Sequence, residues 1–376
     1  MRAINVTSPG GGGTAGFDMT VRAPRPEFEI WRNGVRNRAL AHVADFVETR
    51  CVPQLDRTGV GIAGDVLEQF VAGGKCLRST FMYLGWLCGA DHSDAALRAA
   101  AGLELLHAFA LLQDDVMDDS QLRRGRPAAH VEFSQWHRDR GLAGCSERFG
   151  AAQAVLLSDL CLVWAEQMMR ESGLDSDALY RAWPHYDAMR IELAVGQCAD
   201  VANDVGVLPD LDTVLDVARR KSGNYTVRRP LEIGAAMAGC DYLIDALGSY
   251  GSAVGEAFQM RDDIMGVFGS PAVTGKPAGG DLAERKATSV VVAAQRMADS
   301  TIRRQFAELM RAERLDDADI EHWRTLIVAT GAPAWIEELI TERVAAAIDR
   351  IDDQRIDGWV RDALADMAAV CTLRTT

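Results

Sequence analysis

LLQDDVMDDSQLRRGRP (residues 111–127) joins the end of an apolar stretch to a dense acidic cluster and then to a basic loop. The preceding stretch, AAGLELLHAFALL (100–112), is apolar most of the way round a helix, which predicts a central, buried helix. At 3.6 residues per turn, Asp114 and Asp118 share one helix face about 6 Å apart. Two carboxylates at that distance repel by about 3 kcal/mol at an effective dielectric constant of 20. Since the helix dipole also disfavours negative charge at this end, the arrangement calls for a cation.

A second apolar stretch, AVGEAFQM (253–260), runs in the same way into Arg261, Asp262 and Asp263. Oxygen ligands at such spacing suit Mg²⁺, which typically takes one or two carboxylates and fills its octahedron with water and phosphate oxygens. For either cluster alone, a solvated acidic helix end is the alternative. Two clusters, each ending a central helix, predict facing carboxylates that clamp a polyanionic ligand through shared metal ions.

Basic residues gather where loops interrupt the helices. They are Lys75 and Arg78 beside Gly73-Gly74, Arg123, Arg124 and Arg126 after the first acidic cluster, Lys221, and Lys276 and Lys286 beyond the second. Arg offers a planar fork to phosphate oxygens and Lys a point charge, although each residue taken singly equally fits a surface ion pair. The chain has no GxxxxGK[ST] phosphate-binding loop, so a nucleotide-binding fold is not predicted. It also has no GxSxG and no HExxH, so neither a serine hydrolase nor a zinc protease of these types is predicted.

Helical periodicity extends over most of the chain, and no convincing strand pattern appears. It begins at Phe28 and recurs over 77–90, 94–119, 145–171, 174–203, 211–238, 241–268, 284–312, 317–329, 333–350 and 356–370. The sequence therefore predicts an all-α protein with one helical domain over 27–376. The Gly-rich segment 1–26 is predicted to be a flexible tail.

Composition excludes several classes of protein. Of 376 residues, 48% are hydrophobic and 7% aromatic, which is typical of an ordered helical chain. A net charge of -14 argues against nucleic acid as a partner. The eight cysteines show no zinc-like spacing and predict free, mostly buried thiols in a cytoplasmic protein. No membrane span or secretory signal is expected.

These features together resemble the trans-isoprenyl (polyprenyl) diphosphate synthase family, most closely the actinobacterial geranylgeranyl diphosphate synthases. The resemblance covers nearly all of 27–370 and rests on six ordered motifs: GGKCLR (73–78), ELLHAFALLQDDVMDDSQLRRGRP (104–127), GQCAD (196–200), KS (221–222), FQMRDD (258–263) and TGKPAGGDL (274–282). It implies an isoprenoid-synthase-type helical bundle around a central cavity, and a homodimer. It also implies an enzyme that condenses isopentenyl diphosphate with an allylic diphosphate.

The resemblance further implies a role for individual residues. Asp114, Asp118 and Asp262 would bind about three Mg²⁺, with Asp115 and Asp119 in support. Arg123, Lys221 and Lys276 would hold the allylic diphosphate, and Lys75, Arg78, His107 and Arg124 the isopentenyl diphosphate. Ser222 would also bind substrate, and Gln197, Asp200 and Gln259 would line the cavity. Without the motif, His107 would equally fit a core histidine.

The chain departs from the family pattern at several positions. Cys76 stands where Arg is usual, Ser79 where Pro is common, Gln113 where His is common, and Gly266 where many members have a third Asp. The first Asp of that motif, Asp262, is present, so we expect activity.

Side chains one turn or more before Asp114 are expected to form the wall that stops chain growth. In the family, an aromatic residue at the Phe109 position with a small residue at Ala110 accompanies a twenty-carbon product, so geranylgeranyl diphosphate is predicted. The alternatives are a farnesyl diphosphate synthase, a class I terpene cyclase, and a non-catalytic subunit of a heteromeric synthase.

Overall fold

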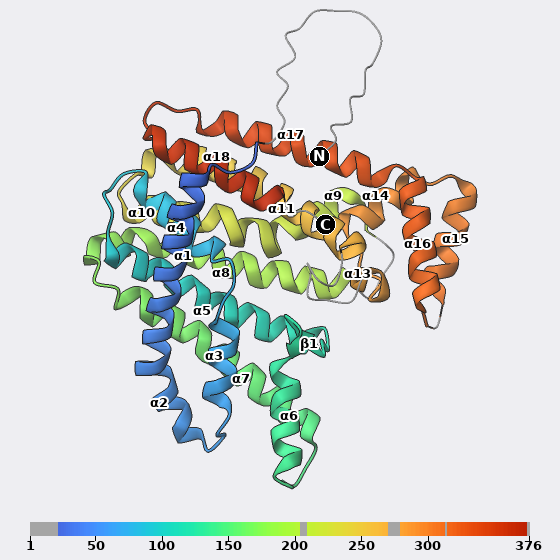
Figure 1. The fold of residues 1–376 in the computed structure, drawn as a ribbon, viewed down its shortest axis with the longest axis horizontal. Helices are drawn as coiled ribbons and strands as arrows, with labels where there is room; N and C mark the ends of the chain where they lie inside the picture. The colour runs from blue at the N-terminus through green and yellow to red at the C-terminus, as the bar shows by residue number, and fades with distance from the viewer. Residues whose placement is uncertain (1–21, 204–208, 270–278, 313, 374–376) are drawn as a thin grey trace, which may run out of the picture.

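The computed structural model describes residues 22–203, 209–269, 279–312 and 314–373, and most of them are in helices (Figure 1). The α-helices are α1 (Pro26–Phe46), α2 (Val52–Leu55), α3 (Ala63–Val71), α4 (Leu77–Leu87), α5 (Asp94–Met117), α6 (Ala129–Asp139), α7 (Ser146–Arg170), α8 (Ser176–Asn203), α9 (Leu211–Ala218), α10 (Arg229–Met237), α11 (Ile244–Phe268), α13 (Gly280–Ala283), α14 (Ser289–Met297), α15 (Ser300–Arg311), α16 (Asp317–Ala329), α17 (Ala332–Ile351) and α18 (Gly358–Thr372). Two π-helices, η1 (Val47–Cys51) and η3 (Arg219–Arg228), and two 3₁₀ turns, η2 (Asp56–Thr58) and η4 (Asp241–Leu243), complete them. The all-α prediction is confirmed.

Within the described residues, strand pairing is limited to β1 (Leu122–Arg123) and β2 (Arg126–Pro127), a two-residue antiparallel ladder. The helices α3 and α6 were not expected from the periodicity. The stretch predicted as one helix over 211–238 divides into α9, η3 and α10. The stretch over 284–312 divides because Thr288 caps α14 and Asp299 caps α15 with their side-chain oxygens.

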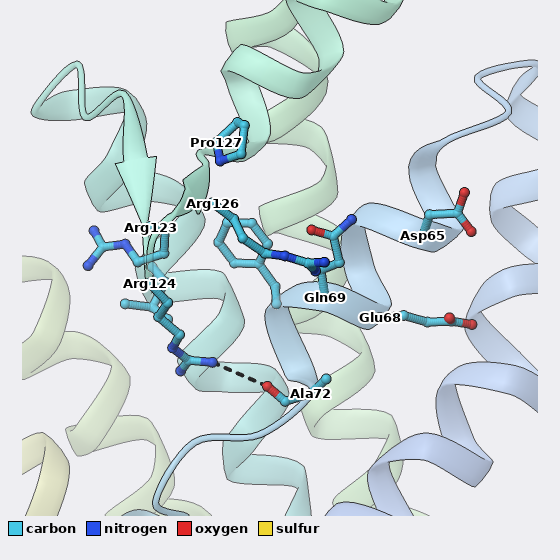
Figure 2. Close-up of a pocket in the computed structure, with 10 residues that line it drawn as sticks. Asp65, Glu68, Gln69, Ala72, Arg123, Arg124, Arg126 and Pro127 are labelled. Atoms are coloured by element: carbon cyan, nitrogen blue, oxygen red, sulfur yellow. Dashed lines mark hydrogen bonds between the residues drawn. The ribbon is translucent and has the colours of Figure 1, made fainter. Parts of the chain in front are cut away.

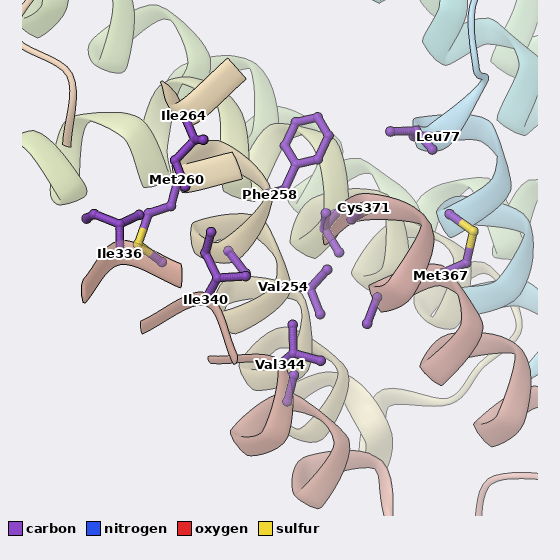
Figure 3. Packing of buried hydrophobic residues seen from close by; sticks show 14 of the residues in the cluster. Leu77, Val254, Phe258, Met260, Ile264, Ile336, Ile340, Val344, Met367 and Cys371 are labelled. Atoms are coloured by element: carbon purple, nitrogen blue, oxygen red, sulfur yellow. The ribbon is translucent and has the colours of Figure 1, made fainter. Parts of the chain in front are cut away.

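The apolar core has two large parts. In one, Val254, Met260 and Ile264 of α11 pack in a single cluster with Ile336 and Ile340 of α17 (Figure 3). Buried side chains of α18 belong to the same cluster. The other gathers buried side chains of α1, α3, α5, α7 and α8. Both predicted central helices, α5 and α11, are therefore in the interior.

Helices α5 and α7 are long and apolar enough to cross a membrane by length and composition alone, although the sequence predicts no membrane span. The most apolar window of α5 is 67% buried and that of α7 is 39% buried. A core helix passes the same test, so this is weak evidence for a span. Six of the eight cysteines are buried, and no two of the cysteines that the structure describes are joined in a disulfide, as predicted.

Two glycines let α8 and α11 close in on η3. A Cβ on Gly196 of α8 would lie 2.6 Å from the backbone nitrogen of Lys221, and one on Gly255 of α11 would lie 2.7 Å from backbone atoms of Gly223. Larger residues would push the helices apart. Because these two positions carry no side chain, η3 packs closely against α8 and α11, and this packing positions Lys221.

Candidate active site

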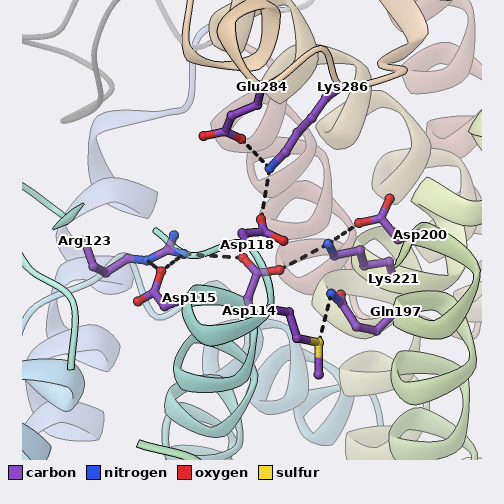
Figure 4. A network of polar contacts seen from close by, with 10 residues as sticks. Asp114, Asp115, Asp118, Arg123, Gln197, Asp200, Lys221, Glu284 and Lys286 are labelled. Carbon is purple, nitrogen blue, oxygen red and sulfur yellow. Dashed lines mark hydrogen bonds and ion pairs between the residues drawn. The ribbon is translucent and has the colours of Figure 1, made fainter. Parts of the chain in front are cut away.

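The C-terminal end of α5 carries a network of three aspartates and three cations (Figure 4). Arg123 donates through Nε to Oδ1 of Asp115 at 2.8 Å, and its Nη2 lies 3.3 Å from Oδ2 of Asp114. Lys221 Nζ from η3 lies 3.2 Å from Oδ1 of Asp114. On the far side, Lys286 donates to Oδ2 of Asp118 at 3.0 Å. Cations from three separate segments thus converge on one helix end.

Burial and charge compete at this network. Burial alone would raise the pKa of Asp114, but Lys221 and Arg123 outweigh it and hold that pKa below its ordinary value. Burial would lower the pKa of Lys221, but Asp114 and Asp200 raise it, and Lys221 donates to Oδ2 of Asp200 at 2.6 Å. Both members of the Asp114–Lys221 pair are therefore charged at neutral pH.

At the end of α11, the second of the two aspartates is anchored by neutral donors. Asp263 is 6% exposed and accepts from the backbone N–H of Ser289 at 2.8 Å, from its Oγ at 2.6 Å, and from Gln259 Nε2 at 2.9 Å. Burial raises the pKa of Asp263, and these hydrogen bonds offset the rise only in part. Ser289 follows Lys286 by three residues, so one short segment contacts both aspartate clusters.

A cavity of about 750 Å³ opens beside the α5 network. Its lining comes from α5, from η3 and from Leu193, Gln197 and Val201 of α8, and includes Phe109 and Ala110. The volume lies within the usual range for small-molecule sites, and the lining is mostly apolar, with polar groups at the C-terminal end of α5 and around His107. An apolar tail and an anionic head both find complementary surroundings here.

A second group of polar side chains surrounds His107, two turns before Asp114 on α5. The guanidinium of Arg78 lies 4.2 Å over the Tyr225 ring, and His107 packs 6.4 Å from that ring, centre to centre. Arg78 Nε, His107 Nδ1 and the Tyr225 hydroxyl are buried without a hydrogen-bond partner. Burial lowers the pKa of His107 well below its ordinary value, and Arg78 and Arg124 lower it further. Three unsatisfied polar groups side by side call for a polar ligand.

Arg124 reaches this region from the β1–β2 turn, where its backbone is left-handed with φ of 53°. Its Nη1 donates to the carbonyl of Ala72 at 3.3 Å, and its Nη2 lies 3.6 Å from where a Cβ of Gly74 would be, next to exposed Lys75. Burial lowers the pKa of Arg124, and the neighbouring Arg123 adds to the effect. An anion at this point would relieve the repulsion between like charges.

A further cavity of about 560 Å³ lies on the other side of the turn, between Arg123, Arg124 and Arg126 and the helix α3 (Figure 2). Its α3 wall carries the carboxylates of Asp65 and Glu68. This mixed charge makes it less suitable for an anionic ligand than the larger cavity.

Most of the predicted site residues fall into two groups. Asp114, Asp115, Asp118, Arg123, Asp200 and Lys221 meet in the network, while Arg78, His107, Phe109, Ala110, Gln197 and Ser222 line the larger cavity. Gln259 lies outside that lining and holds Asp263, and the Asp119 side chain is 90% exposed. Lys276 lies outside the described residues. Tyr225 and Lys286 are not among the predicted site residues, although Lys286 is one of the loop cations named above.

The donor set fits a magnesium–ligand complex. Oδ2 of Asp115 is buried without a partner, and Oδ1 of Asp114 has the ion pair with Lys221 but no hydrogen bond. In the described part of the chain, no three His, Cys, Asp or Glu side chains form a ready-made metal site. Mg²⁺ suits such a site because it takes few carboxylates and completes its shell with phosphate oxygens and water.

The chain is similar in sequence to a known protein family and to several of its members. The sequence profile of the Polyprenyl synthetase family matches residues 62–327. The chain is 31% identical to geranylfarnesyl diphosphate synthase of Aeropyrum pernix, over 77% of this chain and 87% of that protein. It is 33% identical to geranylgeranyl diphosphate synthase of Mycobacterium tuberculosis, over 74% and 75% of the two chains.

A solved structure agrees with the sequence comparisons. Geranylgeranyl pyrophosphate synthase from Corynebacterium glutamicum, determined in complex with isoprenyl diphosphate and magnesium, has a TM-score of 0.86 to this chain at 34% identity. The similarity covers 93% of this chain and 99% of that one. The helical bundle described above is therefore the fold of that synthase, as the sequence had predicted.

Proposed function

Because the chain belongs to the polyprenyl synthetase family and is a prenyltransferase, we propose that it extends allylic diphosphates with isopentenyl diphosphate to make geranylgeranyl diphosphate. The observation that carries the proposal is the ring of Arg123, Lys221 and Lys286 around Asp114 and Asp118 at the mouth of the apolar cavity. It offers one place where a diphosphate, its counter-ions and a hydrocarbon tail fit together.

Asp114 and Asp118 of α5 would hold Mg²⁺ from one side of the allylic diphosphate and Asp262 of α11 from the other. About three ions are proposed. When bound, they neutralise the leaving diphosphate and so favour ionisation of the allylic carbon–oxygen bond. Arg123, Lys221 and Lys286, which pair with aspartates here, would turn their donors toward the phosphate oxygens. Lys276 is proposed to join them.

The isopentenyl diphosphate is placed at Lys75, Arg78, His107 and Arg124. The unsatisfied nitrogens of Arg78 and His107 support this assignment, because a phosphate would supply their missing acceptor. Its double bond attacks the allylic cation, a carbon–carbon bond forms, and the proton lost from isopentenyl goes to the released diphosphate. The apolar lining, including Phe109, keeps water from quenching the cation.

Two of the alternative functions, a terpene cyclase and a non-catalytic subunit, fit the features of this chain less well. A terpene cyclase has no use for a second diphosphate site, yet the Arg78–His107–Tyr225 group is built into the same cavity. A non-catalytic subunit usually lacks the aspartates, and this chain keeps both clusters.

Product length is a proposal, since relatives of this chain carry farnesyl, geranylgeranyl and geranylfarnesyl names. Phe109 and Ala110 both line the cavity, which supports their assignment as its wall. The test is to incubate the full chain with isopentenyl diphosphate, Mg²⁺ and dimethylallyl, geranyl or farnesyl diphosphate, and to size the dephosphorylated alcohols. Geranylgeraniol is expected; a cyclic hydrocarbon, or no turnover, contradicts the proposal.

Ala110→Phe tests the wall, with Ala110→Ser as the matched control. The larger side chain is expected to shorten the product to fifteen carbons or fewer, and Ser is expected to leave it unchanged. An unchanged product from Ala110→Phe contradicts the assignment of the wall but not of the reaction.

A homodimer is also proposed. On α7, Leu156 and Val163 are 56% and 58% exposed, lie two turns apart on one face, and would be covered by a second copy. Light scattering on the full chain should give twice the chain mass, and Leu156→Glu with Val163→Glu should reduce it. A cytoplasmic location and the division into tail 1–26 and domain 27–376 stay predictions.

A further inference from the structure

Gly266 stands on α11 one turn beyond Asp262, with the same four-residue spacing that separates Asp114 from Asp118 on α5. A side chain at 266 would share the helix face of Asp262. That space is already filled, because a Cβ on Gly266 would lie 1.8 Å from Oδ2 of Asp281 and 2.5 Å from its Cγ. A side chain at 266 and the Asp281 carboxylate therefore exclude each other.

Asp281 is held in this place by its own segment. It belongs to the short helix α13, which begins after Gly279, a residue with a left-handed φ of 72°. The next residue, Leu282, is fully buried, and the N–H of Lys286 donates to the Asp281 carbonyl at 2.8 Å. The backbone from which the Asp281 carboxylate extends is thus fixed by packing.

The same segment contacts both aspartate clusters. Lys286 donates to Asp118 at the end of α5, and Ser289 donates to Asp263 at the end of α11. Asp281 is therefore carried by the segment that links the two halves of the site, and its carboxylate lies where a side chain from α11 would begin.

We propose that Asp281 supplies the carboxylate that α11 lacks at Gly266, so that Asp262 and Asp281 together hold the divalent cation on this side of a diphosphate. The inference rests on the proposed function and adds a metal-holding residue to it. Side chains at positions 262 and 266 of a helix are about 5–6 Å apart at Cβ, a distance that two carboxylates span around one cation. The Asp281 carboxylate occupies the second of these places.

The test moves the carboxylate between the two elements. Asp281→Asn removes the charge with little change in shape, and the double variant Gly266→Asp/Asp281→Gly transfers it from α13 to α11. The measurement is calorimetric titration of inorganic diphosphate into the full chain over a series of MgCl₂ concentrations. The unfolding temperature of each variant is recorded without ligand. Asp245→Asn, on the exposed first turn of α11, is the control.

Asp281→Asn is expected to raise the MgCl₂ concentration needed for half-maximal diphosphate binding by about 10- to 100-fold, with little change in unfolding temperature, and the double variant is expected to recover most of the loss. An unchanged magnesium requirement in Asp281→Asn overturns the inference, whether or not the variant is less stable. If the double variant does not fold, Asp281→Asn alone decides.

Asp114→Asn separates this inference from the proposed function. A magnesium requirement that rises in Asp114→Asn but not in Asp281→Asn overturns only the role of Asp281. Diphosphate binding by the unmodified chain that does not depend on magnesium overturns both.

Discussion

At the end of α5 the sequence reads DDVMD (114–118), and at the end of α11 it reads DDIMG (262–266), so two central helices end in the same pattern except at its last residue. In both, the second aspartate is buried and anchored by the protein: Asp115 is 1% exposed and Asp263 is 6% exposed. Asp115 is held by the charged Arg123, whereas Asp263 is held by the neutral Ser289 and Gln259.

This difference shows how charge is distributed over the site. Arg123, Lys221 and Lys286, the cations of the network, all pair with aspartates at the end of α5. We infer that the α5 end binds the phosphate with these cations as well as with metal ions, whereas the anchor of Asp263 adds no cation at the α11 end. The variants below test this division.

Asp114→Asn and Asp262→Asn should have the largest effects. Each removes a charge directed at the leaving group, and loss of one preorganised electrostatic group typically costs about 10²- to 10³-fold in kcat. Asp114→Asn should cost more, because it also unbalances Lys221 and Arg123. Steady-state kinetics with geranyl diphosphate measures both, with Asp245→Asn as the control. A larger loss in Asp262→Asn contradicts the division.

Lys286→Gln should come next. Hydrogen bonds to charged groups contribute about 1.5–3 kcal/mol, so kcat/KM for the allylic diphosphate should fall by about 10- to 100-fold. Arg296→Gln, on the exposed side of α14, is the control. The chain contains only four lysines, at 75, 221, 276 and 286, so amine-reactive labelling followed by peptide mapping gives an independent readout. Diphosphate with Mg²⁺ should protect Lys286, and full labelling of Lys286 in their presence contradicts its role.

Those four lysines also show that the sequence contained a signal for Lys286, which is not among the predicted site residues. All of them lie in or beside the recognised motifs, while the other basic residues, 40 in total with these four, are arginines. That contrast was a signal for Lys286 independent of any motif. The aspartate clusters were found from the sequence because charge at the end of an apolar helix stands out against its period.

Other parts of the site left no such signal. Tyr225 lies in the π-helix η3, where the helical register changes, so a period of 3.6 does not reveal which face it occupies. Gly266 looked like a lost ligand, because Asp281 enters its space from a different element fifteen residues later in the chain. Contacts between distant segments depend on packing, which local pattern does not encode.

Ser289→Ala tests how the α11 end is anchored. It removes the 2.6 Å hydrogen bond from Oγ to Asp263 but leaves the backbone N–H bond in place. A buried carboxylate that loses one partner should lower the free energy of unfolding by about 1–3 kcal/mol, as measured by urea denaturation. Ser300→Ala, at the exposed first residue of α15, is the control. A neutral result would mean that Gln259 and the backbone alone suffice to hold Asp263.

The smallest effect should appear in the dependence of stability on pH, and it should come from α5. Seven residues before its first aspartate, α5 carries His107, whereas α11 has Gly255 at the equivalent position. Burial and nearby cations lower the pKa of His107 in the folded protein, so the unfolded chain binds this proton more readily. The stabilisation is therefore present above the unfolded pKa of about 6.5 and is lost as the pH falls through it, by at most about 1.4 kcal/mol per pH unit.

His107→Gln should remove this contribution, so the unfolding free energy of the variant should fall less steeply than that of the unmodified chain between pH 7 and pH 5. Subtracting the two urea-denaturation profiles isolates His107 from the carboxylates, whose titration both proteins share. Parallel profiles would mean that His107 takes up its proton without cost in the folded state. The group formed with Arg78 and Tyr225 would then have to accommodate an imidazolium, which contradicts the lowered pKa of His107.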